Sequence, residues 1–186
     1  MRPTWPPACG SHKRLPCRAL NCLSLHLTKA LGTLMDNNGP GFTIQNRGVL
    51  IGNRLLKVAG INVGPGSVVS ENDIGDAPAA AITVRGPRCC VEENYIADSR
   101  MGIVVVAGAG EALIDGNQIT GTASGVVIDE KPPGCFVVRN CVRGMSGTVA
   151  YTIPAGSSYG PIVAVAGVGD ISQVAASTHP WANFSY

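Results

Sequence analysis

The sequence predicts an all-β fold in which short strands wind into stacked coils. A short pattern anchored on asparagine recurs five times, and apolar residues alternate with polar ones between the copies. The composition agrees, because 45% of the 186 residues are apolar and only 14% are charged, with 24 glycines and 13 prolines. An ordinary soluble domain carries about 25% charged residues, and a disordered chain is poor in aliphatics. The composition therefore excludes a disordered chain and a coiled coil.

The repeat is clearest when the chain is aligned on its asparagines. The segments VLIGN, VVSEN, CVEEN, LIDGN and FVVRN end at Asn53, Asn72, Asn94, Asn117 and Asn140. An aliphatic residue lies three positions before each asparagine and two positions after it. An aliphatic pair with one residue between follows in each unit: Ile61/Val63, Ile82/Val84, Ile103/Val105, Val126/Ile128 and, more weakly, Val149/Tyr151.

Units of this size predict stacking. Period-2 alternation in short runs indicates strands, and the Gly, Asp, Ser and Asn between them indicate turns. A unit of about 20 residues cannot bury its own apolar face, so neighbouring units must pack on one another. Equivalent side chains then stack at about 4.8 Å, which predicts aliphatic ladders inside and an asparagine ladder at a bend. Asparagine suits a bend because it tolerates the left-handed backbone and its amide can bond along the stack.

The repeat N-x-I … G-I-x-V resembles the right-handed parallel β-helix of the pectate-lyase-like type, over roughly residues 42–170. The resemblance implies a β-helix of about six coils across residues 36–170. It also implies an extracellular, cell-surface or phage-associated location, although the sequence has no clear signal peptide. Proteins that resemble this one are often polysaccharide lyases, glycoside hydrolases or tailspike parts, and a lyase would imply Ca²⁺. A leucine-rich repeat is excluded because its L-x-x-L-x-L ladder is missing.

The two ends depart from the repeat. Residues 1–18 contain four prolines and predict a disordered leader. Residues 19–35 place leucines at spacings of three and four, which predicts an amphipathic helix that plugs the first coil. A signal segment, or a stretch foreign to the fold, is the alternative. Residues 162–165 predict a last strand, and residues 171–186 an aromatic cap; Trp181 and Tyr186 could instead form a sugar-stacking platform.

The charge distribution and the cysteines limit the kinds of partner and cofactor that are expected. The formal net charge is +2, but residues 1–35 hold five basic residues and no acid, so residues 36–186, with nine basic and twelve acidic residues, carry −3. Basic clusters with interleaved aromatics are missing there, so no nucleic-acid partner is expected. No apolar run reaches the roughly 18 residues of a membrane helix. The seven cysteines include no C-x-x-C pair, which predicts free buried thiols and no metal site or cofactor. The odd count argues against a complete disulfide framework, and one or two disulfides are the alternative.

The candidate chemistry lies just before the asparagines. Glu71 and Glu93 occupy equivalent positions in neighbouring units, with Arg139 next in register, and Glu92 and Asp115 form a second equivalent pair one residue earlier. Two carboxylates about 5 Å apart would raise each other's pKa and form an acid/base pair or hold a cation. The alternative interpretation is an acidic strip that only keeps the outer face soluble.

Two hypotheses for function follow. The first is a non-catalytic or accessory β-helix, or a fragment of a larger one, that presents a surface to a polysaccharide or another protein chain. The second is a carbohydrate-active enzyme, a lyase or hydrolase, with Glu71, Glu93, Asp115 and Arg139 as its catalytic residues. The sequence does not specify an oligomeric state.

Overall fold

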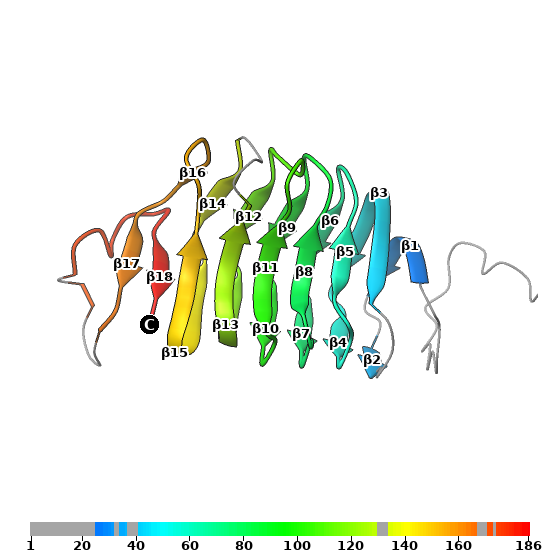
Figure 1. The fold of residues 1–186 in the computed structure, drawn as a ribbon, viewed down its shortest axis with the longest axis horizontal. Coiled ribbons are helices and arrows are strands. Elements are labelled where there is room, and N and C mark those ends of the chain that lie inside the picture. The colour runs from blue at the N-terminus through cyan, green and yellow to red at the C-terminus, as the bar shows by residue number, and fades with distance from the viewer. Residues whose placement is uncertain (1–24, 32–33, 37–40, 130–133, 167–170, 173) are drawn as a thin grey trace, which may run out of the picture.

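A computed structural model describes residues 25–31, 34–36, 41–129, 134–166, 171–172 and 174–186. All strand pairs in these residues run parallel, and they form a right-handed solenoid of about six turns (Figure 1). The predicted fold class is therefore confirmed. Each full turn passes through three faces, which are numbered here in the order in which the chain meets them after a ladder asparagine.

Face 1 follows the asparagines and contains β2 (Leu34–Asp36), β4 (Arg54–Leu56), β7 (Asp73–Gly75), β10 (Tyr95–Ala97), the first parts of β13 (Gln118–Ile128) and β15 (Cys141–Thr152), β18 (Asn183–Ser185) and β17 (Ile162–Ala164). Face 2 contains the first part of β1 (Leu25–Leu31), the first part of β3 (Phe42–Ile51), β5 (Ile61–Val63), β8 (Ala80–Val84), β11 (Met101–Val105) and the later parts of β13 and β15. Face 3 contains the ends of β1 and β3, then β6 (Val68–Ser70), β9 (Cys90–Glu92), β12 (Leu113–Asp115), β14 (Phe136–Val138) and β16 (Ser158–Tyr159).

The core consists of aliphatic columns that point inward from the three faces. Every member of the following set is at most 2% exposed: Leu55, Ile74, Ile96, Ile119 and Val142 on face 1; Ile61, Ile82, Ile103, Val126, Val63, Val84, Val105 and Ile128 on face 2; Leu50, Val69, Val91, Ile114 and Val137 on face 3. Burying a side chain of this size contributes about 1.5–3 kcal/mol to the stability of the fold. A coil gains this contribution only when a neighbouring coil covers its apolar side chains.

The asparagine ladder forms as predicted and has one more member. Asn53, Asn72, Asn94, Asn117 and Asn140 are buried and are joined by Asn183, which is fully buried. In each step the amide Nδ2 and the backbone N–H of one asparagine donate to the Oδ1 of the next, at 2.9–3.1 Å. The ladder thus satisfies buried backbone donors at the bend.

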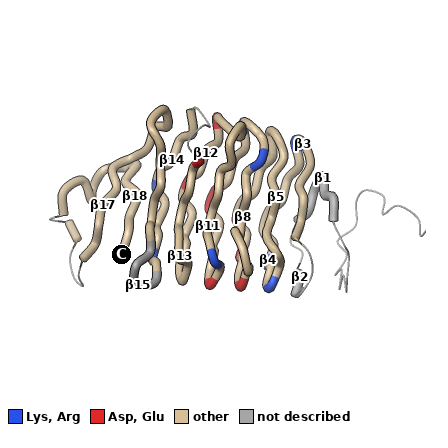
Figure 2. Tube along the Cα trace, in the orientation of Figure 1, with Lys and Arg blue, Asp and Glu red and all other residues tan. Residues whose placement is uncertain are grey.

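The left-handed backbone at this bend does not lie on the asparagines. It lies on the residue before each of them: Gly52, Glu71, Glu93, Gly116 and Arg139, with φ between 55° and 66°. The other two corners show the same arrangement, with Lys57, Asp76, Asp98 and Gly121 between faces 1 and 2 and Arg47, Gly66, Arg88, Glu111 and Gly134 between faces 2 and 3. Because exposed side chains at a sharp corner reach solvent, these non-glycine positions are charged, as Figure 2 shows for part of the chain.

One predicted pair is out of register. The sequence pattern paired Val149 and Tyr151 with Val126 and Ile128, but the structure aligns Ser124 with Val149 and Val126 with Tyr151. Paired residues are 23 positions apart at Gln118 and Cys141 but 25 apart at Ser124 and Val149, because β15 carries two extra residues between these points. Val149 is consequently 53% exposed, and Tyr151 packs against the core instead.

At the N-terminal end, the expected helix over residues 19–35 is replaced by strands wherever the structure describes the chain. β1 pairs with β3, and β2 pairs with β4. Residues 25–31 contain leucine at alternate positions as well as at helical spacing, and pairing along the open edge of β3 satisfies their backbone groups as one further coil. The leader over residues 1–18 and the rest of the expected helix lie outside the described residues.

At the C-terminal end, the predicted strand near Ile162 is β17, but residues 183–185 are a strand of the solenoid rather than part of a cap. β18 pairs with β15 on one side and with β17 on the other, so the later segment lies between two earlier ones (Figure 1). The Tyr151 hydroxyl lies 2.9 Å from the carbonyl oxygens of Asn140 and Phe184, which links β18 to the preceding coil.

Four of the cysteines lie in described residues, and all four are free thiols, as expected. Cys89 and Cys135 are buried as expected, whereas Cys90 and Cys141 are partly exposed. The pKa of Cys89 is raised because burial disfavours its thiolate. A membrane-spanning helix is not found in the described part of the chain.

Candidate binding face and its borders

The predicted carboxylates lie along one edge of face 3. Glu71 and Glu93 occupy the same left-handed corner position in neighbouring coils, as the flanking pairs Ser70–Glu92 and Asp73–Tyr95 require. Equivalent backbone positions are separated by one strand spacing of about 4.8 Å. Glu92 and Asp115 are likewise aligned, one residue earlier on the strands. The two alignments predicted from the sequence are therefore present.

Asp115 is bound by an arginine. Arg139 Nε donates to Asp115 Oδ1 at 2.7 Å, and Nη2 donates to Oδ2, so the guanidinium engages both carboxylate oxygens. This hydrogen bond, together with the charge of Asp115, raises the pKa of Arg139. Only 12% of the Asp115 side chain is exposed. An arginine fork of this kind neutralises the carboxylate and orients both groups.

The four proposed catalytic residues thus form two separate pairs. Glu71 and Glu93 lie next to each other at the corner. Asp115 lies one coil beyond Glu93 and is bound by Arg139, which lies two coils beyond Glu93. Gly116 occupies the corner position between Glu93 and Arg139, and the Glu93 side chain lies alongside it, 3.5 Å from where a Cβ would stand. Across the described residues, no group of three His, Cys, Asp or Glu side chains is arranged to hold a metal ion.

The two aromatic residues proposed for sugar binding contact different strands. Trp181 packs edge-on against Phe136 of β14, with ring centroids 5.9 Å apart and planes at 80°, and its other ring neighbour is His179. The Tyr186 hydroxyl lies 3.3 Å from the Cys141 sulfur, and its ring lies near Arg143. The rings therefore do not build one platform, although both are about half exposed.

Face 3 carries a surface feature that the sequence reasoning missed. Its outward positions form an unbroken apolar row through five coils, called here the apolar stripe: Val49, Val68, Cys90, Leu113 and Phe136. All five are at least partly exposed. The signal was available, because each of these residues lies four positions before a ladder asparagine.

The stripe is straight and about 19 Å long, since its four steps each span about 4.8 Å. Phe136 and the exposed Trp181 ring lie at its C-terminal end. Ser70, Glu92 and Asp115 form a polar column two residues farther along the strands, and Glu71 and Glu93 form the border beyond it. Within this column Ser70 and Asp115 are buried, so Glu92 is the polar group that lies partly exposed beside the stripe.

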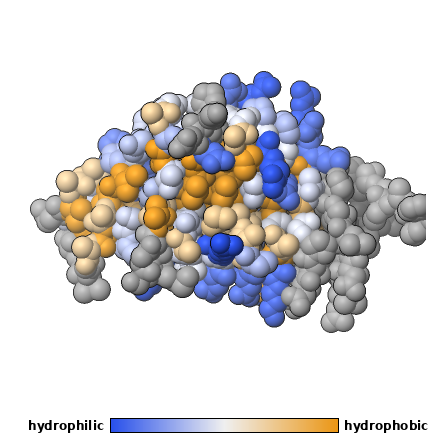
Figure 3. Space-filling model, viewed as in Figure 1, coloured by the Kyte–Doolittle hydropathy of each residue, from blue (hydrophilic) through white to orange (hydrophobic). Residues whose placement is uncertain are grey.

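Face 2 is different in character. Figure 3 shows hydrophobic surface over its middle, where Val104, Val106 and Val127 are partly exposed on and just after β11 and β13. This surface is confined to neighbouring coils. The earlier coils carry Asn62 and Thr83 at the same outward position.

Comparison with protein families agrees with the architecture. Residues 33–153, about two thirds of the chain, match the family model described as the right handed beta helix region. No curated protein and no solved structure matches the chain.

Proposed function

Because the chain belongs to the right-handed β-helix family, we propose that its coils form a rigid scaffold that binds a linear polysaccharide along face 3 without cleaving it. The observation that carries this proposal is the apolar stripe with Trp181 at its end. A sugar ring has an apolar face of C–H groups and a rim of hydroxyls. The stripe suits the first, and the partly exposed Glu92 beside it suits the second.

The arrangement also matches the shape of a linear polymer. Side chains repeat along the solenoid axis in a straight line, and successive sugar rings would rest on successive coils. Trp181 would contribute most, since aromatic rings bury large areas and contact C–H groups well. A contiguous apolar row at the surface supports the proposal, because large exposed apolar patches are often interaction sites.

The alternative of a carbohydrate-active enzyme has less support. Acid/base catalysis needs carboxylates whose protons can move, and both oxygens of Asp115 accept hydrogen bonds from Arg139. Glu71 and Glu93 are exposed corner residues, which is also the pattern of a solvated strip.

Binding and turnover can be measured in the same mixtures. Isothermal titration calorimetry with soluble neutral polymers, namely xylan, glucomannan and hydroxyethyl cellulose, should show binding by the wild-type protein. Trp181→Ala and Leu113→Asp should each weaken it by about tenfold or more, which corresponds to about 1.4 kcal/mol. Tyr95→Ala is the matched control, because Tyr95 is 45% exposed but lies on face 1.

Absence of binding to every polymer, or an equal loss in Tyr95→Ala, would overturn the proposal. Release of reducing ends that is abolished by Glu93→Ala would instead establish a hydrolase.

A further inference from the structure

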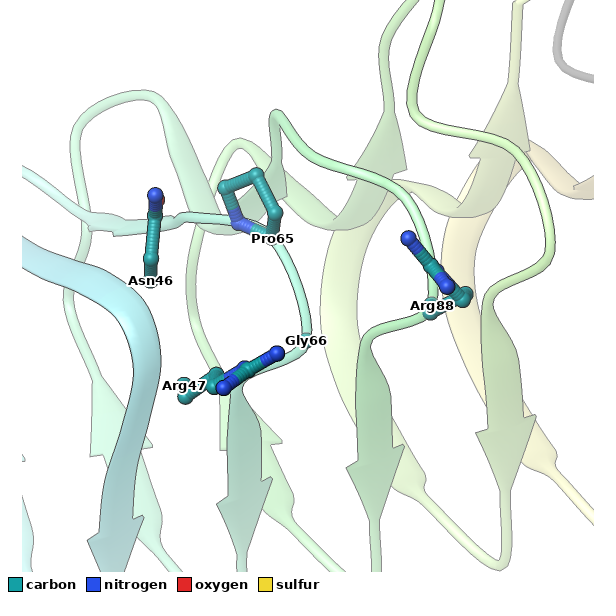
Figure 4. Close-up of a pocket in the computed structure, with 5 residues that line it drawn as sticks. All are labelled: Asn46, Arg47, Pro65, Gly66 and Arg88. Carbon is teal, nitrogen blue, oxygen red and sulfur yellow. The ribbon is translucent and has the colours of Figure 1, made fainter.

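The corner between faces 2 and 3 carries a second feature at the N-terminal end of the stripe. Arg47, Gly66 and Arg88 occupy one left-handed column in three consecutive coils, with φ of 57°, 64° and 59°. With Asn46 and Pro65 they line an open depression of about 800 Å³ (Figure 4). The two arginines lie two coils apart, or about 9.6 Å between backbone positions.

Gly66 keeps the space between the arginines open. A Cβ at this position would stand 3.5 Å from Cγ of Arg47, so the Arg47 side chain lies beside the glycine. In Figure 4 the two arginine side chains flank the Pro65–Gly66 turn. Two guanidinium groups therefore border a shallow floor that has no side chain on Gly66 to fill it.

The charges of these arginines are only weakly compensated. Arg88 has one carboxylate neighbour, Glu111, at 3.8 Å, and their side chains are 78% and 66% exposed. A pair this open and this long contributes little. Within the described part of the chain, Arg47 makes no ion pair. A guanidinium fork matches the oxygens of a carboxylate or sulfate, so both are available to an anionic ligand.

The position of this corner relates it to the stripe. Arg47 and Arg88 each precede a stripe residue, Val49 and Cys90, by two positions, while the acidic Glu71 and Glu93 border the opposite side of face 3. We propose that Arg47 and Arg88 bind the anionic groups, carboxylates or sulfates, of an acidic polysaccharide whose backbone lies on the apolar stripe. This inference rests on the proposed function and specifies its ligand.

The two borders would also orient the polymer. Over the three coils from Arg47 to Glu93, anionic substituents are attracted to the arginine side and repelled from the Glu71–Glu93 side, so charged groups would bind along one edge there. The next two coils carry the opposite charges at these corners, Glu111 and Arg139. Unlike charges placed on opposite borders give such selectivity more than they give affinity.

A matched pair of polymers separates this inference from the proposed function. Hydroxyethyl cellulose and carboxymethyl cellulose share a backbone and differ in charge, and cellulose sulfate replaces the carboxylate by sulfate. We expect the wild-type protein to bind the two charged polymers more tightly than the neutral one at low salt. The difference should shrink as NaCl increases, because the Debye length falls to about 10 Å at 0.1 M.

The double variant Arg47→Gln/Arg88→Gln should lose about tenfold or more of its affinity for the charged polymers and keep its affinity for hydroxyethyl cellulose. Lys57→Gln is the matched control, because Lys57 is also an exposed, left-handed corner cation but lies between faces 1 and 2. The variant Arg47→Gly/Arg88→Gly should show the same loss without lower stability, since glycine suits the left-handed backbone.

Inorganic sulfate is the remaining probe. If millimolar sulfate displaced carboxymethyl cellulose as effectively as cellulose sulfate does, the corner would bind free oxyanions rather than a polymer. That result would overturn the polymer assignment. Equal affinities of wild type and the double variant for the charged polymers would also overturn it. Suppose that Trp181→Ala no longer binds hydroxyethyl cellulose, while the double arginine variant binds the charged polymers as well as wild type does. The proposed function would then be supported, and the assignment of the arginines would be wrong.

Discussion

Oδ1 of Asn117 accepts two hydrogen bonds from Asn94, one from the backbone N–H at 3.1 Å and one from Nδ2 at 3.0 Å. Each side-chain oxygen of the ladder thus serves two donors of the preceding coil. The Asn94 amide also reaches the carbonyls of Val69 and Glu92. One side chain therefore bonds to the backbone of its own coil and of the preceding one, and to the Asn117 side chain in the next coil.

Removing that side chain should be costly. Asn94→Ala leaves buried donors of Asn72 without their acceptor and a buried carbonyl without its donor, and we expect a loss of about 3 kcal/mol or more in the free energy of unfolding. Urea denaturation followed by circular dichroism measures it. Gln118→Ala, at an exposed position on the next coil, should change stability by less than about 0.5 kcal/mol. Equal effects of the two substitutions would contradict the role given to the ladder.

Gly125 is required by close packing of backbones. A Cβ there would stand 2.4 Å from the carbonyl oxygen of Ala150 and 2.5 Å from Cγ1 of Val142. Gly125→Ala should therefore force neighbouring coils apart and lower the melting temperature, at a cost of about 1–3 kcal/mol. Ser124→Ala, one residue earlier on the same strand, should leave the melting temperature nearly unchanged. A melting temperature for Gly125→Ala within a degree of wild type would show that the coils can separate freely.

Cys90 should be a poorly reactive thiol even though it is partly exposed. Burial, followed by a hydrogen bond and the negative charge of Glu92, raises its pKa from 9.0 to about 12. At pH 9 only about one molecule in a thousand would carry the reactive thiolate, compared with half for an ordinary thiol. Iodoacetamide labelling at pH 9 with peptide mapping should show Cys90 modified far more slowly in native protein than in urea. Glu92→Gln should speed its labelling, and an unchanged rate would argue against the effect of Glu92.

The stability of the last coils should depend on pH through the phenol of Tyr151. Burial raises the pKa of its phenol above the ordinary value of 10.0, so this group stabilises the fold fully below pH 10. The contribution is lost as the pH rises further, because only the unfolded chain can then release the proton. Thermal melts from pH 8 to 11 should show a steeper alkaline decline in wild type than in Tyr151→Phe.

Tyr151→Phe should also cost about 1–2 kcal/mol at neutral pH, since the carbonyls of Asn140 and Phe184 lose their shared donor. Hydrogen exchange should locate the effect at the amides of residues 183–186. Faster exchange spread evenly over the solenoid would instead indicate a general loss of packing.

The repeat allowed the fold to be predicted because its chemistry is locally encoded. Asn53 to Asn140 recur at nearly even spacing, so the spacing alone places both the ladder and the buried aliphatic columns. Asn183 was missed because it lies 43 residues after Asn140, and the pattern has no way to show that the chain returns. The left-handed positions were assigned one residue too late, since glutamate and arginine carry no compositional signal for that backbone.

The candidate site was predicted less completely for a related reason. Glu71 and Glu93 were predicted as catalytic residues because they are carboxylates, whereas Val68 and Leu113 have the pattern of ordinary strand residues. Each of them directly precedes the inward aliphatic residue of its strand, so strict alternation along the strand would have shown that they point outward, as the register confirms. The pairing of Arg139 with Asp115 depends on side-chain reach across coils, which spacing alone does not determine.

The insertion of β18 between β15 and β17 has a consequence for biosynthesis. From β3 to β15 the order of strands along the stack follows the order of translation, so each coil can dock on its predecessor as it leaves the ribosome. β17 emerges before β18 but lies beyond it in the stack, so it cannot dock in its final position until Asn183–Ser185 have been made. A nascent chain stopped before these residues would therefore expose the unpaired edge of β15, the kind of edge that recruits other strands and that chaperones recognise.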